Sequence, residues 1–482
     1  MNLCYYNIMI NDTKAKNNNY YFVTISMVAA TAGILFGYGT GIIAGAILFI
    51  SHDFHLTALM NGTLVSALLF GALVGAACSG ALSDALGRKV ILAIAAGFFV
   101  IGSMIAAVSP SLPLLIIGRI LVGVAIGVAS YAAPLYISEI APPKFRGVLV
   151  SLNQLAINIG IIIAYIVNYV FAQSAAWRWM FGLGVVPAIL LLVGMIFLPR
   201  SPRWLIIKGH HNKALAVLRR IRGGNREVDH EVSEIRAMID QSQKGKAQWY
   251  LLFSKTIRPV VIIGVVLAIM QQVTGINTIL YYAPTIFSAG QQQSYNDAML
   301  TTMGIGVILL LFTIIALPLI DIVGRRKLLL SGLLGMTLAL LTMSWSFDHS
   351  GSGLAGILLH AAILLYIACF AFSLGPVVWL MIAEIYPLKV RGLGASLATG
   401  VNWLSNAIIA FTFLSIVKSI GVSYTFLLYS FMCVLSLLFV YFLVPETKGV
   451  TLERIEANLF QGKKWRYLGQ DKLNNEKNKN AL

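Results

Sequence analysis

The chain has 482 residues and a formal net charge of +17. Hydrophobic residues make up 58% of it and charged residues only 11%. A soluble domain carries about 25% charged residues and could not bury this much apolar surface, so soluble folds are excluded. The positive charge would suggest a nucleic-acid partner in a soluble protein. Here the basic residues fall between apolar runs, so no nucleic-acid binding is expected.

Apolar runs long enough to cross a bilayer recur along the whole chain. A spanning helix needs about 20 apolar residues. Such runs lie near residues 21–48, 59–82, 90–108, 112–137, 149–172, 179–198, 258–286, 299–320, 328–347, 354–382, 394–417 and 422–443. The 43 glycines suit close packing of helices in a membrane bundle. The sequence therefore predicts an all-α membrane protein with twelve transmembrane helices.

Lysine and arginine distinguish the two sides of this expected bundle. Loops on the side of the N-terminus are basic, as at Arg88 and Lys89, whereas the opposite loops hold little beyond Arg178 and Lys418. Basic loops stay in the cytoplasm, so both termini are expected there. The expected organisation is a cytoplasmic tail (1–20), a six-helix half (21–199), a cytoplasmic linker with short helices (200–257), a second six-helix half (258–445) and a cytoplasmic tail (446–482).

Three motifs occur once in each half. Glu139-Ile-Ala-Pro-Pro-Lys-Phe-Arg146-Gly matches Glu384-Ile-Tyr-Pro-Leu-Lys-Val-Arg391-Gly 245 residues later, Asp84-Ala-Leu-Gly87-Arg88 matches Asp321-Ile-Val-Gly324-Arg325 237 residues later, and Pro199-Arg-Ser-Pro matches Pro445-Glu-Thr-Lys more loosely 246 residues later. Each copy lies at the equivalent inner loop of its half. Two pseudo-symmetric halves with a site between them are a known transporter architecture.

Four acidic residues of these motifs are expected at inner helix ends, where the helix dipole disfavours negative charge. Each needs a cationic partner from its own motif or from a neighbouring helix. The repetition favours contacts that hold helices together at the inner face over ordinary basic flanks with acids added for solubility. The residues of this predicted cytoplasmic gate are Asp84, Arg88, Glu139, Arg146, Asp321, Arg325, Glu384 and Arg391.

The seventh expected span carries an unusual group of amides. Gln271, Gln272 and Asn277 lie within it, and Tyr281 shares a helix face with Asn277. Gly275 weakens the helix between the two amide groups. Amides inside a membrane are costly unless they bind something, and they both donate and accept hydrogen bonds, as sugar hydroxyls require. Hydrogen bonding between helices is the structural alternative.

These motifs resemble those of a known family. Gly80-Ala-Leu-Ser-Asp84-Ala-Leu-Gly87-Arg88-Lys89 looks like the loop 2–3 signature of the major facilitator superfamily, and Pro199-Arg-Ser-Pro-Arg-Trp204-Leu and Pro445-Glu-Thr-Lys-Gly449 resemble its sugar porter family. The resemblance implies the major facilitator fold. It also implies sugar binding by Gln271, Gln272, Asn277, Tyr281, Gln154, Trp379 and Asn402. Ile161, on the same helix face as Gln154, would supply an apolar wall, and Pro284 and Gly375-Pro376 are candidate gating hinges.

The first span bears on how transport is driven. Proton coupling usually needs a buried carboxylate inside the membrane. In the segment from Phe36 to Gly41, proton-coupled relatives carry Asp at the position of Gly39, and the resemblance implies that the equivalent of Arg119 faces that Asp. All 18 acidic residues fall in tails, loops or helix ends. Arg119 should instead face a wet cavity or backbone carbonyls, and uniport is favoured over proton symport.

Smaller features remain open. Leu309 takes the place of a sugar-contacting Asn common in the family, and Arg200 replaces an acid common in the Pro-x-Ser-Pro-Arg motif. His360, inside a span, is more typical of a packed residue than of a coupling group.

The leading hypothesis is a monosaccharide transporter, for a hexose or pentose, that works by alternating access in a cell membrane, with protons left open as a co-substrate. A proton-coupled symporter is the alternative, and a sugar sensor with a transporter fold is the alternative from another class. No enzyme activity, metal or cofactor is expected, because no nucleophile–base pair or ligand cluster is visible.

Overall fold

The computed structural model describes the backbone of residues 2–142, 146–222, 228, 232–233, 249–291, 295–349, 353–387, 390–450 and 452–469. Side chains are described for residues 22–142, 149, 151–221, 228, 232–233, 249–286, 298–349, 353–387, 390–450 and 454–469. Of the predicted cytoplasmic linker (200–257), residues 223–227, 229–231 and 234–248 lie outside the described part of the chain.

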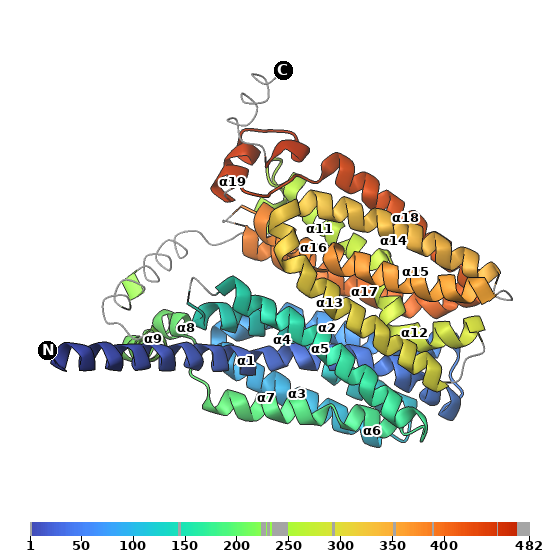
Figure 1. The fold of residues 1–482 in the computed structure, drawn as a ribbon, viewed down its shortest axis with the longest axis horizontal. Coiled ribbons are helices and arrows are strands. Elements are labelled where there is room, and N and C mark those ends of the chain that lie inside the picture. Colours follow the sequence, from blue (N-terminus) through green and yellow to red (C-terminus); the bar gives the residue numbers. More distant parts are fainter. Residues whose placement is uncertain are drawn as a thin grey trace. The chain divides into compact units, whose positions relative to one another are not determined.

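Within these residues every regular element is helical (Figure 1), and twelve helical stretches are long and apolar enough to cross a membrane. They cover Phe22–Asp53, Ala58–Leu86, Arg88–Val108, Leu112–Ile140, Ser151–Ala172, Trp177–Phe197, Arg258–Ile286, Ala298–Val323, Arg325–Asp348, Gly353–Ile385, Arg391–Ile420 and Val422–Leu443. The all-α fold with twelve spans is confirmed, and the bounds mostly exceed the predicted ones because polar residues continue each helix past its apolar run.

The chain groups into two compact units. Unit 1 comprises residues 1–42, 70–164 and 176–246, and unit 2 comprises residues 43–69, 165–175 and 247–482. This spatial grouping differs from the sequence halves at 43–69 and 165–175, so the division into halves at 21–199 and 258–445 stays a prediction.

Unit 1 contains most of the first six spans and two short helices. Its elements are α1 (Asn2–Asp53), α2 (Ala58–Leu86), α3 (Arg88–Val108), α4 (Leu112–Ile140), α5 (Arg146–Ala172), α6 (Trp177–Gly182), α7 (Val185–Phe197), α8 (Pro202–Ile207) and α9 (His211–Arg222), with α1, α2 and α5 continuing into unit 2. Small residues let α3 and α4 approach closely, since a Cβ at Gly118 would lie 2.8 Å from the carbonyl oxygen of Gly102.

Unit 2 contains the remaining spans and the segments that flank them. Its elements are η2 (Trp249–Phe253), α11 (Arg258–Val273), α12 (Ile276–Gln291), α13 (Tyr295–Val323), α14 (Arg325–Asp348), α15 (Gly353–Phe372), α16 (Leu374–Ile385), α17 (Arg391–Ile420), α18 (Val422–Leu443), α19 (Leu452–Phe460) and η3 (Trp465–Tyr467). Two of its spans are each made of two helices, α11 with α12 and α15 with α16.

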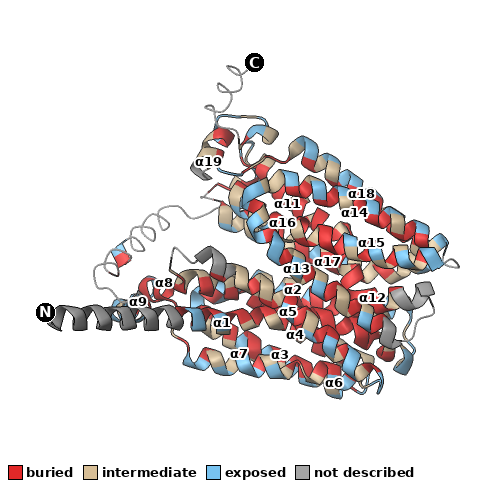
Figure 2. Ribbon diagram, viewed as in Figure 1, coloured by how far each residue is buried: buried red, intermediate tan, exposed pale blue. Residues whose placement is uncertain are grey.

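Buried and exposed residues both occur along the helices of the bundle (Figure 2). Large apolar side chains are among the exposed ones, as at Phe197, Val108 and Ile357, which are 70–80% exposed. In water such faces would drive aggregation, whereas lipid solvates them at no cost. The distribution of exposed residues therefore agrees with a chain that spans a membrane.

Candidate substrate-binding site and charged clusters

The two interrupted spans of unit 2 are broken at residues that tolerate unusual backbone. Between α11 and α12, Gly275 adopts a φ of 90°, which strongly favours glycine. Between α15 and α16, Ser373 adopts φ −120° and ψ −97°. Pro376 lies in the first turn of α16, where a missing N–H costs no hydrogen bond. Pro284, a predicted hinge, lies inside α12 without ending it.

Side chains join the two breaks. The Gln271 amide nitrogen donates to the carbonyl oxygens of Leu374 at 2.9 Å and Gly375 at 3.2 Å. In the opposite direction, the Tyr366 hydroxyl donates to the Thr274 carbonyl at 2.8 Å. Carbonyls freed by a break in a buried helix need such partners. Gln271 and Tyr366 thereby fix the two breaks against each other.

The predicted sugar-binding amides of unit 2 form one buried network. Gln272 lies at its centre: its nitrogen donates to Asn402 Oδ1 at 3.1 Å, and its oxygen accepts from Asn277 at 2.6 Å. Asn402 in turn donates to Gln271 Oε1 at 2.8 Å. Gln271, Gln272 and Asn402 are each 4–5% exposed. Residues from α11, α12 and α17 therefore present neutral donors and acceptors at one place beside the helix breaks.

Sequence reasoning missed Asn406, which contacts the predicted site residue Tyr281. Its amide nitrogen donates to the Tyr281 hydroxyl at 3.3 Å. Asn406 is 5% exposed, and its Oδ1 has no hydrogen-bond partner among the described residues. A buried acceptor without a partner is costly, so it is suited to accept from a ligand hydroxyl. The available signal was its spacing of four residues from Asn402 on one face of α17.

The other predicted site residues have different surroundings. Trp379 lies on α16, in unit 2 like the amides, and is 38% exposed. Gln154 and Ile161 lie on α5 in unit 1, where Gln154 is half-buried and Ile161 is 6% exposed. Ile161 lies beside α1, because a Cβ at Gly41 would meet its Cα at 3.3 Å. Ile161 thus packs against α1.

Replacing Gly275 by alanine should destabilise the protein by about 2 kcal/mol or more, because the positive φ is unfavourable for other residues. A new Cβ would also lie 2.6 Å from the Tyr429 ring. Thermal unfolding in detergent measures the effect. Gly304→Ala is the control, since a Cβ there meets nothing within 4 Å. Equal unfolding temperatures for the two variants would contradict this reading of the helix break.

In unit 1, the backbone of α1 takes the place of a carboxylate beside Arg119. Arg119 is 2% exposed, and its Nη1 donates to the Gly39 carbonyl at 2.8 Å. Its guanidinium also lies over the Phe181 ring, 5.8 Å from the centroid. A Cβ at Gly39 would lie 2.7 Å from Ile126 Cδ1, so side chains fill this space. The charge of Arg119 is therefore satisfied by a carbonyl, one of the two partners that the sequence suggests.

One predicted gate cluster lies at an end of unit 1. Arg88 lies 3.1 Å from Glu139 and 3.3 Å from Asp84. The Ser201 hydroxyl donates to Glu139 at 2.5 Å. Glu139 and Arg88 are 3% and 7% exposed, whereas Asp84 is 75% exposed. The buried pair Arg88–Glu139 thus joins the start of α3 to the end of α4.

Unit 2 repeats this arrangement. Arg325 lies 2.9 Å from Glu384 and 3.1 Å from Asp321. Thr447 donates to Glu384 at 2.5 Å, as Ser201 does to Glu139. In both units the arginine of the Asp-x-x-Gly-Arg motif is the ion-pair partner of the glutamate from the other motif. The repeat seen in the sequence is therefore a repeat of geometry.

Arg146 and Arg391, which lie seven residues after Glu139 and Glu384, were also predicted gate residues. Arg391 Nε donates to the Tyr386 carbonyl at 3.2 Å. The side chain of Arg146 lies outside the described residues.

Two other residues that the sequence analysis singled out are also placed. Leu309 is buried in α13, and His360 Nδ1 lies 2.8 Å from the Gly356 carbonyl of its own helix.

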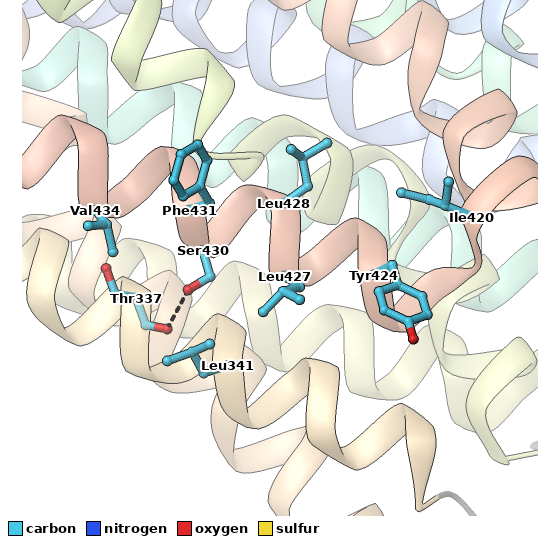
Figure 3. A pocket seen from close by; sticks show the side chains of 9 residues that line it. All are labelled: Thr337, Leu341, Ile420, Tyr424, Leu427, Leu428, Ser430, Phe431 and Val434. Atoms are coloured by element: carbon cyan, nitrogen blue, oxygen red, sulfur yellow. Dashed lines mark hydrogen bonds between the residues drawn. The ribbon is translucent and has the colours of Figure 1, made fainter.

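An apolar groove of about 830 Å³ lies between α14 and α18 (Figure 3). Leu341, Leu427 and Phe431 line it, and its Ser430 hydroxyl donates to the Thr337 carbonyl at 3.3 Å. The groove offers few polar groups, so it is unsuited to a sugar.

The fold and the amide network define a helical membrane protein with a buried polar site at interrupted spans, the arrangement of secondary transporters. A family model described as "Sugar (and other) transporter" matches residues 25–459. The chain therefore belongs to the sugar transporter family, a family of transporters rather than enzymes.

Individual proteins agree with this assignment. The galactose-proton symporter of Escherichia coli K12 is 42% identical over 470 residues, covering 95% of this chain and 98% of its own. The D-xylose transporter of Levilactobacillus brevis is 42% identical over 433 residues, covering 89% and 94%. The xylose transporter XylE from E. coli, in a partially occluded inward open conformation, matches with a TM-score of 0.80 and 34% identity over 90% of this chain and 100% of its own.

Proposed function

We propose that this protein carries a monosaccharide, a hexose or pentose, across a bacterial cytoplasmic membrane by alternating access. The observation that carries the proposal is the buried network of Gln271, Gln272, Asn277 and Asn402 beside two helix breaks. Neutral amides match the hydroxyls of a sugar, which both donate and accept. The names of the relatives, which include galactose and D-xylose transporters, support a sugar of this size.

Uptake by cells that lack their own sugar carriers tests the proposal. Cells producing this protein should take up at least one of labelled galactose, arabinose, xylose or glucose, and unlabelled substrate should compete. Cells without the protein give the background. Uptake that never exceeds this background for any hexose, pentose or polyol would exclude sugar transport.

We further propose that both termini lie in the cytoplasm and that the two charged clusters act as an inner gate. The basic loops support this orientation. Each cluster joins loops and helix ends on the side where positive charge gathers, as in Arg88 with Glu139 and Arg325 with Glu384. Alternating access requires such contacts to break when the site opens inward.

For the driving force we propose uniport. Arg119 has the Gly39 carbonyl at 2.8 Å, and no acidic side chain of the described chain interrupts the middle of a span. Proton symport is the second candidate, because the relatives include the galactose-proton and arabinose-proton symporters of E. coli.

A pH electrode outside weakly buffered cells separates the two modes. We expect sugar addition to leave the external pH unchanged, because no carboxylate of the described residues lies in the middle of a span to carry the proton. The rate of sugar entry should also be insensitive to a protonophore. A cell producing a known sugar–proton symporter is the positive control. Sugar-induced alkalinisation that matches this control would overturn uniport.

A further inference from the structure

A strongly basic surface lies on the helical hairpin formed by α8 and α9 in unit 1. Residues 200–222 contain seven lysines and arginines and no acidic residue. The described basic side chains among them are exposed: Arg200, Arg203, Lys208, Lys213, Arg219 and Arg220. This set is called the basic hairpin surface below.

Packing fixes which side of the hairpin is exposed. A turn at Gly209, with φ 78°, reverses the chain, and the His210 N–H donates to the Leu205 carbonyl at 2.8 Å. The apolar residues of both helices gather in one buried cluster that includes Trp204, Leu205 and Leu218. The basic side chains are therefore left on the outer side of the hairpin by the amphipathic pattern.

Trp204 attaches the hairpin to the ends of two spans. Its indole N–H donates to the Asp84 carbonyl at 3.1 Å, and a Cβ at Gly87 would lie 3.1 Å from its ring. Asp84 and Gly87 lie where α2 ends and α3 begins. The preceding span, through α7, ends at Phe197, three residues before Arg200. The basic hairpin surface is thus held beside the ends of three spans.

The internal repeat shows that Arg200 stands where unit 2 has an anion. In unit 2 the position equivalent to Arg200 is Glu446, whose carboxylate accepts from the backbone N–H groups of Arg325 at 3.0 Å and Arg326 at 3.1 Å. Arg200 instead lies over the Trp204 ring, 4.8 Å from its centroid, and close enough to Lys89 for the two charges to repel. A resident anion in one unit is replaced by a cation in the other.

We propose that the basic hairpin surface binds the phosphate of anionic phospholipids in the adjoining leaflet. Lysine and arginine clusters next to a span are attracted to anionic headgroups, each contributing about 1 kcal/mol. Arg200 and Lys208 both lie over the Trp204 ring, 4.8 and 5.9 Å from its centroid, so two cations are available to one phosphate there. The bound lipid supplies the negative charge that Glu446 supplies in unit 2. A solvated face without lipid selectivity is the competing reading.

Native mass spectrometry of the full-length protein tests the proposal. The purified protein is titrated with phosphatidylglycerol or phosphatidylcholine, and the variant Lys208→Gln/Lys213→Gln is compared with the control Lys463→Gln/Lys464→Gln, which removes the same charge from the C-terminal segment. The hairpin variant should lose about fivefold in phosphatidylglycerol affinity per charge removed, which is about 25-fold in all. The control should lose less than about twofold, and phosphatidylcholine binding should not change.

Three results would overturn the assignment. Equal binding of the two lipids, or an equal loss in both double variants, would show a solvated face. Inorganic phosphate at millimolar concentration forms a separate arm: if it displaces phosphatidylglycerol completely, the ligand is free phosphate and not a lipid. Unchanged elution volume and sugar uptake identify variants that are folded.

Discussion

Replacing Gln272 by alanine is expected to weaken sugar binding about 30-fold, or about 2 kcal/mol, the penalty for buried polar groups that lose their partner. Gln272 bridges Asn277 and Asn402 at 2.6 and 3.1 Å. Its loss removes one group for the sugar and also leaves two other amides wrongly oriented. The affinity is measured by isothermal titration of the purified protein, and transport by labelled sugar uptake.

Gln173→Ala is the matched control, because Gln173 is exposed and lies between α5 and α6. It should bind and transport as the unchanged protein does. Equal affinity of the Gln272→Ala and Gln173→Ala variants would remove the amide network from the substrate site. In that case the network would serve only to hold α11, α12 and α17 together, the structural alternative for polar groups inside spans.

The second large effect is expected at the buried ion pair of unit 1. Arg88→Met should destabilise the protein by about 3–5 kcal/mol, because it leaves the Glu139 carboxylate buried without its cation. Glu139 is 3% exposed and lies 3.1 Å from Arg88. The unfolding temperature in detergent reports the loss.

Two companion variants identify the cause. Asp84→Asn removes the other carboxylate near Arg88, but Asp84 is 75% exposed, so the change should cost less than about 1 kcal/mol. The double variant Arg88→Met/Glu139→Gln should recover much of the stability, since no unpaired charge remains. A double variant no more stable than Arg88→Met would show that packing of the arginine, and not its charge, is what matters.

The spans were predictable from sequence because hydrophobicity over some 20 residues is a strong and local signal. The network around Gln272 was also foreseeable in part, since amides inside an apolar run need partners somewhere. Which partners they have was not foreseeable. Asn402 lies 130 positions from Gln272, and only folding brings α17 beside α11.

The partners within the gate clusters could not be foreseen from the sequence either. The sequence places an arginine seven residues after Glu384, yet Glu384 pairs with Arg325, 59 positions away. Helix ends bring together residues from different loops, and spacing along one loop does not reveal this. The seventh span is interrupted at Gly275, whose positive φ suits glycine. Pro284, by contrast, lies inside α12 and does not end this helix. Asn406 was overlooked although it lies four residues from Asn402 on one face of α17.

Sugar flux into proteoliposomes of purified protein, with and without an imposed proton gradient, tests the central claim most directly. We predict that a hexose or pentose enters until its internal concentration equals the external one, and that the gradient changes neither the end point nor the direction. Failure of every sugar to enter would contradict transport, and accumulation above the external concentration under the gradient would contradict uniport.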